Sequence, residues 1–196
     1  ALFAHPQIRP EADLDSFREI FGVGPARTPG CGVFRGLREV KPGCVLEYSR
    51  ERVKESPYWV LEAKPHTDSY AQTVETVSWL LRDAVKRQLV SDVPVCSFLS
   101  GGIDSSVVTA IASRQLGQEG VTLNTFSFDF AHNDACFQSN AFQPTRDRPY
   151  VDQVLALYPL HHTYLECDEA TLAGLLGDAV RMKDLPGMTD VDASLL

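Results

Sequence analysis

The feature that most constrains the fold is an apolar segment that leads through two glycines into a helical pattern. Residues 93–99 form a short apolar run, as expected of a buried parallel strand. Ser100-Gly101-Gly102 follows directly, and residues 104–116 have the pattern of a helix. A strand that turns tightly into a helix begins a βαβ unit, so the sequence predicts an α/β fold.

The flanking residues repeat this alternation of strand and helix. Further strands are predicted at 122–128 and 161–166, and further helices at 70–89, 149–157 and 169–182. Because helices join consecutive strands, we expect a doubly wound, mostly parallel sheet. Such a sheet carries helices on both faces.

Residues 1–60 have a different pattern. Asp13 is expected to cap a short helix, and strand-like runs follow at 33–40, 44–48 and 52–60. These runs suggest the hairpin-rich edge of a β domain, too small to form a complete core.

A polar segment separates the two patterns. Residues 61–68 contain Pro65 and suit a linker. We therefore predict a small β-rich part over 1–60 and the beginning of a larger α/β part over 69–196.

The glycine loop has the chemistry of a phosphate site. Gly101 and Gly102 lack a Cβ atom, so the backbone can approach an anion closely. The N–H groups of the loop and of the first helical turn would then point at phosphate oxygens, aided by the helix dipole. Ser100, Ser105 and Ser106 add hydroxyl donors. We predict that this loop binds the phosphates of ATP.

Asp104 predicts a cation beside those phosphates. A carboxylate would repel phosphate unless Mg²⁺ lay between them, because hard cations take oxygen ligands from both. The alternative is a capped helix after a glycine turn, but Ser100–Ser106 after an apolar strand is more specific than two glycines alone. The GxxxxGK(S/T) and GxGxxG patterns are absent.

Charge and composition argue against other classes of protein. The net charge of -8 disfavours a general nucleic-acid binder. No apolar run reaches the roughly 18 residues of a membrane span, and we expect no signal peptide. Five cysteines without CxxC spacing predict reduced, mostly buried thiols in a cytoplasmic protein.

The segment Ser100–Ser106 resembles the PP-loop, the SGGxDS motif of the N-type ATP pyrophosphatases with an adenine nucleotide alpha hydrolase-like fold. Its surroundings are similar to the glutamine-hydrolysing asparagine synthetase family, and residues 1–60 look like the end of that family's Ntn-type glutaminase domain. The segments that carry the resemblance are residues 24–28, 58–59, 91–99, 124–128, 147–151, 161–162 and 184–190.

This resemblance implies an ATP-dependent ligase that forms an amide. Glutamine would be hydrolysed in an amino-terminal domain, and its ammonia would pass to the synthetase domain. There, ATP and aspartate would give β-aspartyl-AMP and pyrophosphate, and ammonia would displace AMP to yield asparagine. A homodimer is also expected.

The resemblance also assigns roles to residues. Phe98 and Phe128 match positions that flank the adenosine, largely through backbone groups, and Asp104 would bind Mg²⁺. The residues expected to bind pyrophosphate are Ser100, Gly101, Gly102, Asp104, Ser105 and Ser106.

Several other charged residues have two interpretations. Arg146 and Arg148 lie in a long loop, where they either contact phosphates or are solvated. Residues 129–147 are long for a connection, and we expect a lid over the nucleotide. His161 and His162 are adjacent in a strand, so they should face opposite sides and not bind one metal ion.

The sequence departs from the family in two ways. Residue 1 is Ala where the family's glutaminase has a nucleophilic Cys, and no second SGE-type loop precedes Leu196. We therefore expect no complete catalytic set here, and neither glutamine hydrolysis nor asparagine synthesis by the isolated chain. Two alternatives stay open: a related amidotransferase of the β-lactam-synthetase or peptide-modifying kind, and a degenerate homologue that only binds nucleotide or a partner.

Overall fold

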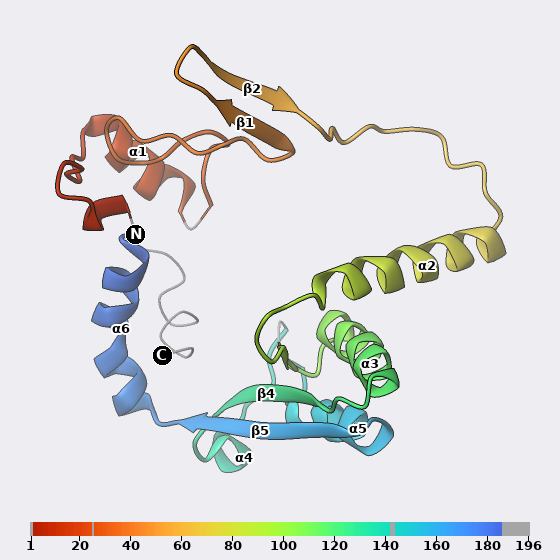
Figure 1. The fold of residues 1–196 in the computed structure, drawn as a ribbon. Coiled ribbons are helices and arrows are strands. Elements are labelled where there is room, and N and C mark those ends of the chain that lie inside the picture. Colours follow the sequence, from red (N-terminus) through yellow and green to blue (C-terminus); the bar gives the residue numbers. More distant parts are fainter. Residues whose placement is uncertain (1, 25, 142–143, 186–196) are drawn as a thin grey trace. The chain divides into compact units, whose positions relative to one another are not determined.

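The computed structural model describes residues 2–24, 26–141 and 144–185, which belong to two compact units (Figure 1). One unit comprises Ala1–Pro65 with Leu176–Leu196, and the other comprises His66–Leu175. In chain order the elements are η1 (Leu2–Ala4), α1 (Leu14–Val23), β1 (Cys44–Tyr48), β2 (Val53–Pro57), α2 (Tyr70–Gln88), β3 (Cys96–Phe98), α3 (Ile103–Gln118), β4 (Leu123–Phe130), α4 (Asn133–Cys136), α5 (Arg148–Leu157), β5 (Leu160–Cys167) and α6 (Glu169–Lys183).

The strands of the second unit form a parallel sheet in the order β3-β4-β5. Cys96 of β3 pairs with Asn124 of β4, and Leu123 of β4 pairs with Leu160 of β5. Helices connect these strands, as the alternating sequence pattern predicted. The α/β class is therefore confirmed.

Helices α3 and α5 cover the same face of this sheet. The register puts Ser97 and Tyr164 on one face. The Ser97 hydroxyl lies 2.9 Å from that of Thr109 in α3, and the Tyr164 hydroxyl donates to Asp152 in α5 at 2.7 Å. Right-handed crossovers between neighbouring strands place both helices on this side. The doubly wound arrangement, with helices on both faces, stays a prediction.

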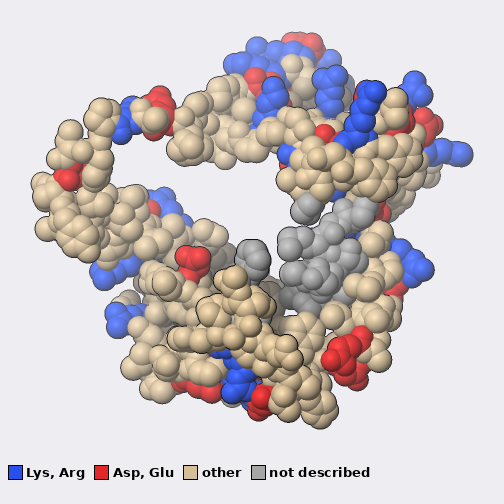
Figure 2. Space-filling model, turned by 180° about the vertical axis from the view of Figure 1, so that it is seen from behind, with Lys and Arg blue, Asp and Glu red and all other residues tan. Residues whose placement is uncertain are grey.

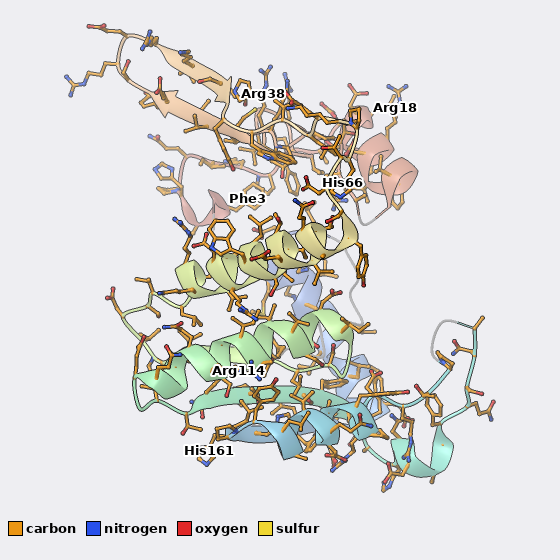
Figure 3. All side chains as sticks on the ribbon, turned by 90° about the vertical axis from the view of Figure 1, so that its right-hand side faces the viewer. Phe3, Arg18, Arg38, His66, Arg114 and His161 are labelled. Atoms are coloured by element: carbon orange, nitrogen blue, oxygen red, sulfur yellow. The ribbon has the colours of Figure 1, made fainter. Side chains whose placement is uncertain are left out.

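The core of this unit lies where α2 and α3 meet the amino-terminal ends of β4 and β5. Val85 of α2, Ala112 of α3 and Leu123 of β4 form a buried cluster, and Leu160 of β5 packs against it. Figure 3 shows α2 beside α3 and α3 next to β4. The apolar residues of α2 recur at helical spacing, but only Val85 among them is fully buried. Most of its apolar face is therefore only partly covered within this unit.

In the first unit, α1 begins at the predicted cap. The Asp13 carboxylate accepts the Ser16 backbone N–H at 3.0 Å, and the Ser16 hydroxyl accepts the Asp13 N–H at 3.1 Å. This reciprocal pair satisfies two backbone donors at the helix start. Strands β1 and β2 form the antiparallel hairpin that the sequence predicted.

The predicted strand over residues 33–40 is wrong. Val33 has a left-handed backbone with φ of 63°, and the Leu37 N–H donates to the Phe34 carbonyl at 3.0 Å. Gly36, inside that turn, has φ of 78°. Glycine adopts this conformation at little steric cost, so its turn preference overrides the apolar alternation around it.

The predicted burial of the cysteines is also wrong. All five cysteines lie within the described residues and are free thiols, but none is fully buried. Cys96 and Cys136 are exposed. The register places Cys96 on the sheet face opposite α3 and α5. Sequence alone could not tell which face helices would cover.

Surface charges contribute little to the fold. Figure 2 shows acidic and basic side chains interspersed on the face that it draws. Exposed pairs such as Arg18–Asp15 and Arg87–Asp83, each at 2.7 Å, are screened by water and add little to stability. Within the described ranges, no helix has the length and apolarity needed to cross a bilayer.

The core assignment predicts a large difference between two leucines. Leu123 is 1% exposed and Leu157 is 75% exposed. We expect Leu123→Ala to lower the free energy of unfolding by about 2–5 kcal/mol, because it leaves a cavity. Leu157→Ala should change it by less than about 0.5 kcal/mol. Urea denaturation of both variants measures this, and equal losses would contradict the proposed core.

Candidate functional site

The candidate site is the loop between β3 and α3, at the carboxyl end of the parallel sheet. Leu99 is fully buried immediately before it. The Leu99 N–H donates to the Phe126 carbonyl at 2.8 Å, and the Leu99 carbonyl accepts the Ser127 hydroxyl. These bonds fix the end of β3 to β4. Open α/β sheets bind ligands at this edge.

Gly101 is packed against the start of α5. Its φ is 77°, and a Cβ atom there would lie 2.7 Å from the Asp147 carbonyl oxygen and 3.2 Å from the Tyr150 Cβ. At Gly102 a Cβ atom would meet only the Ser100 hydroxyl, at 3.6 Å. The first glycine is therefore required by the fold, whereas the second leaves open space beside the loop.

The three serines hold the loop in shape. The Ser105 hydroxyl lies 3.0 Å from the Ser100 hydroxyl and accepts the Ser100 N–H at 3.2 Å. The Ser106 hydroxyl donates to the Gly102 carbonyl at 2.7 Å. Because hydroxyl groups rotate, the same three side chains can also present O–H donors to an anion.

Helix α3 starts without a side-chain cap. Its N-cap is Gly102, which makes no side-chain hydrogen bond to the first turn. The first N–H groups of any helix lack an acceptor within the helix. Here they open onto the loop, where they and the helix dipole favour an anion.

Asp104 fits a metal ion only together with phosphate. It is the acidic residue of the first turn of α3. Within the described part of the chain, no group of three or more His, Cys, Asp or Glu side chains could hold a metal ion. A Mg²⁺ ion at Asp104 would therefore need other oxygen ligands, which nucleotide phosphates and water can supply.

Phe98 and Phe128 lie on the sheet face opposite α3 and α5. Phe98 pairs with Phe126, and Phe128 follows two residues later, so all three point to one side. Phe98 is 58% exposed, and Phe128 is half-buried and packs edge to face against Phe130. The two predicted residues thus share an apolar surface near the loop. Their role beside adenosine stays a prediction.

The two arginines have different surroundings. Arg146 forms an ion pair with Asp134 in α4. Arg148, the first residue of α5, donates to the Glu166 carboxylate at 3.1 Å. Its guanidinium also lies over the Tyr164 ring, 4.1 Å from the centroid.

Tyr164 and Asp147 were missed by the sequence reasoning. Burial raises the pKa of Tyr164 to about 12, and its hydrogen bond to Asp152 adds to the shift. Partial desolvation raises the pKa of Asp147, and the negative charge of Asp129 adds to it. The available signal was the position of Asp147, two residues before the helix predicted at 149–157. That helix follows the strand predicted at 122–128, which was expected to pair with the strand before the loop.

The two adjacent histidines face opposite sides, as predicted. His161 is exposed, and Figure 3 shows its side chain pointing away from α3. The His162 Nδ1 lies 2.8 Å from the Thr125 hydroxyl, and its ring packs edge to face on Tyr164 at 4.4 Å. Burial lowers the pKa of His162, so its neutral form is favoured. His162 Nε2 is buried without a hydrogen-bond partner in the described structure.

Comparison with known proteins identifies related sequences for the whole chain. The sequence model of the asparagine synthase family matches residues 76–196. The chain is 47% identical over 197 aligned residues to a glutamine-hydrolyzing asparagine synthetase 3 of Bacillus subtilis (strain 168). That alignment covers 100% of this chain and 32% of the relative.

More distant relatives carry two kinds of name. An amidase, chyE, of Penicillium rubens is 31% identical over 160 residues, with 78% of this chain and 24% of the relative covered. A putative glutamine-hydrolyzing asparagine synthetase 2 of Methanocaldococcus jannaschii is 36% identical over 93 residues, with 47% of this chain and 18% of the relative covered. The chain thus spans about a third or less of the length of these relatives.

The two loop glycines should respond differently to substitution. We expect Gly101→Ala to destabilise the chain by more than about 1 kcal/mol, because its Cβ would overlap the Asp147 carbonyl at a left-handed φ. Gly102→Ala, the matched control, should cost less, since its φ of -72° suits alanine. Thermal unfolding of both variants measures the difference. A Gly101→Ala variant as stable as Gly102→Ala would refute the packing of this loop against α5.

Proposed function

The chain belongs to the asparagine synthase family, and on that premise we propose that it forms part of the ATP-binding site of an enzyme that makes asparagine. The observation that carries the proposal is the uncapped start of α3 behind Ser100-Gly101-Gly102. Free N–H groups, serine hydroxyls and open space at Gly102 converge there. A triphosphate matches these donors in charge and in hydrogen bonding.

In the proposed complex, this chain's residues hold the leaving pyrophosphate. The backbone N–H groups of the first turn of α3 donate to its oxygens, and Ser100, Ser105 and Ser106 rotate their hydroxyls toward it. Asp104 holds Mg²⁺, which when bound neutralises part of the phosphate charge. Phe98 and Phe128 flank the adenosine.

The chemistry proposed for the whole enzyme is amide formation through an acyl adenylate. The aspartate side-chain carboxylate attacks the α-phosphorus of ATP, and pyrophosphate leaves to give β-aspartyl-AMP. Ammonia from glutamine then attacks the acyl carbon, and AMP leaves as asparagine forms. The name of the Bacillus subtilis relative, a glutamine-hydrolyzing asparagine synthetase, supports this choice of substrates.

We also propose the domain assignment expected from the sequence. Residues 1–60 would be the end of an Ntn-type glutaminase domain, 61–68 the linker, and 69–196 the beginning of the ATP-binding domain. Support comes from the alignment with the Bacillus subtilis relative, which runs through all three segments. The lid over 129–147, the homodimer and the cytoplasmic location stay predictions. Residues 142–143 of the lid and 186–196 of the ATP-binding part lie outside the described residues.

A second candidate is a related adenylating amidotransferase with another acceptor. The 31% identity to an amidase over 78% of this chain favours keeping it. Both candidates use the same loop for ATP, so they differ only in the carboxylate that is activated. Product analysis with aspartate and with other carboxylates on the full-length enzyme distinguishes them.

The proposal predicts Mg²⁺-linked ATP binding that depends on Asp104. We expect the chain to bind ATP more tightly with Mg²⁺ than with EDTA. Asp104→Ala should weaken Mg·ATP binding by at least about 10-fold, because losing a residue that only orients a metal ligand already costs about that much. In EDTA the same variant should bind ATP at least as well as the parent, because a repulsive charge is gone. Isothermal titration calorimetry measures all four affinities.

The matched control is Asp92→Ala, which removes an exposed carboxylate before β3, at the opposite end of that strand from the loop. It should leave Mg·ATP binding unchanged. If Asp104→Ala binds Mg·ATP as tightly as the parent, the assignment of Asp104 to the metal is wrong.

We further propose that the isolated chain binds ATP without turnover. It aligns with only 32% of the Bacillus subtilis relative, so two thirds of that protein has no counterpart here. We expect no asparagine from aspartate, Mg·ATP and glutamine or ammonia, and no glutamate from glutamine. Chromatographic detection of either product from the purified chain would overturn this proposal.

A further inference from the structure

We infer that Arg148 is a phosphate-binding residue of the loop site and that Tyr164 and Glu166 are the residues that position it. This inference rests on the proposed binding of ATP at the loop.

Arg148 lies beside the loop because of the start of α5. The Asp147 carbonyl, one residue earlier, occupies the space next to Gly101 that a Cβ atom would need. Tyr150, two residues later, borders the same space. Residues on both sides of Arg148 therefore border Gly101, through the Asp147 backbone and the Tyr150 side chain. We place the guanidinium beside a ligand in the loop on this ground.

The guanidinium of Arg148 is held by two groups on β5. The Glu166 carboxylate accepts one N–H at 3.1 Å, and the Tyr164 ring lies under the cation at 4.1 Å. Stacking on an aromatic face leaves the edge of the guanidinium available, and arginine has five N–H donors in a fixed plane. One donor on Glu166 thus leaves others for phosphate oxygens.

Tyr164 is itself fixed from both sides. Its hydroxyl donates to Asp152 of α5 at 2.7 Å, and the His162 ring packs edge to face on it at 4.4 Å. These contacts restrict the ring, so the stacked guanidinium has a defined position before any ligand arrives. A positioned cation loses less side-chain entropy on binding.

The carboxylates around the loop make a nearby cation necessary for phosphate binding. Asp104 lies in the first turn of α3, and Asp147 and Asp129 are close enough for the charge of one to raise the pKa of the other. These carboxylates would repel a triphosphate. Both arginines have a carboxylate partner, Asp134 of α4 for Arg146 and Glu166 of β5 for Arg148. Arg148 is the better placed of the two because it belongs to the segment that borders Gly101.

The simpler interpretation is an ion pair that only fastens α5 to β5. A fastening role predicts losses of stability without a specific loss of phosphate affinity. The two interpretations therefore differ in ligand dependence, and they differ most between ATP, pyrophosphate and AMP, because only the first two carry the phosphates that the loop would hold.

The test is calorimetric titration of the chain with Mg·ATP, Mg·pyrophosphate and AMP. We expect Arg148→Ala to weaken Mg·ATP and Mg·pyrophosphate by about 10- to 100-fold, the range for one lost charge-assisted contact, with AMP changed less than about 2-fold. Tyr164→Leu should weaken the same two ligands, and the double variant should be no worse than Arg148→Ala. Tyr164→Phe keeps the ring that stacks on the guanidinium but loses the bond to Asp152, so its affinity should fall between those of the parent and Tyr164→Leu.

Arg114→Ala is the matched control. Arg114 also stacks on a tyrosine, with its guanidinium 5.5 Å from the Tyr158 centroid, and Figure 3 labels it on α3. It lies ten residues beyond Asp104, about 15 Å along the helix. It should leave the affinity for all three ligands unchanged.

Each outcome separates the inference from the proposed function. No Mg·ATP binding by the parent would overturn the proposed function, and this inference with it. Binding by the parent with equal affinity in Arg148→Ala overturns the inference alone. Additive losses in the double variant overturn the positioning role of Tyr164. If Tyr164→Leu does not fold, Glu166→Gln replaces it, and the same non-additivity with Arg148→Ala is expected.

Discussion

The structure around the loop depends on how the end of β3 is anchored to β4. Leu99 is fully buried, and both of its backbone groups are bonded to β4, through Phe126 and the Ser127 hydroxyl. Buried backbone groups must find such partners. Because Leu99 cannot move without breaking them, the chain leaves the sheet at one defined point. The packing of the sheet therefore fixes the position of the Ser100–Ser106 loop.

Hydroxyl groups on the helix-covered face extend this anchoring. Ser97 bonds to Thr109 of α3, and Thr125 bonds to His162 of β5. A face of leucines and valines alone would bury more apolar area but would leave the register of helix and strand less defined. Satisfied polar contacts make the alignment specific. The same face then carries Tyr164, so the stacking of Arg148 follows from the strand register.

Apart from the short helix α4, the sequence was sufficient to predict the order of helices and strands in the α/β part and the loop itself, because both depend on local pattern. It failed at residues 33–40, where glycine turns interrupt an apolar alternation. It also could not show that Gly101 meets Asp147, or that Arg148 meets Glu166. Those contacts join residues far apart in the chain, and their distances depend on how α5 and β5 pack. Cys96 was expected to be buried but is exposed, because the helices cover the other face of the sheet.

The two faces of the sheet give the loop a polar side and an apolar side. The polar side consists of the N–H groups and hydroxyls of the loop and of α3, which follow Leu99 in the chain. Phe98, one residue before Leu99, points to the sheet face that α3 does not cover. Phe126 and Phe128 of β4 share that face. A nucleotide has the same division, since its phosphates need donors and its base needs apolar surface. In the proposed complex, with phosphates at the start of α3, the base would lie next to these aromatic side chains, and one strand end would serve both halves of the ligand.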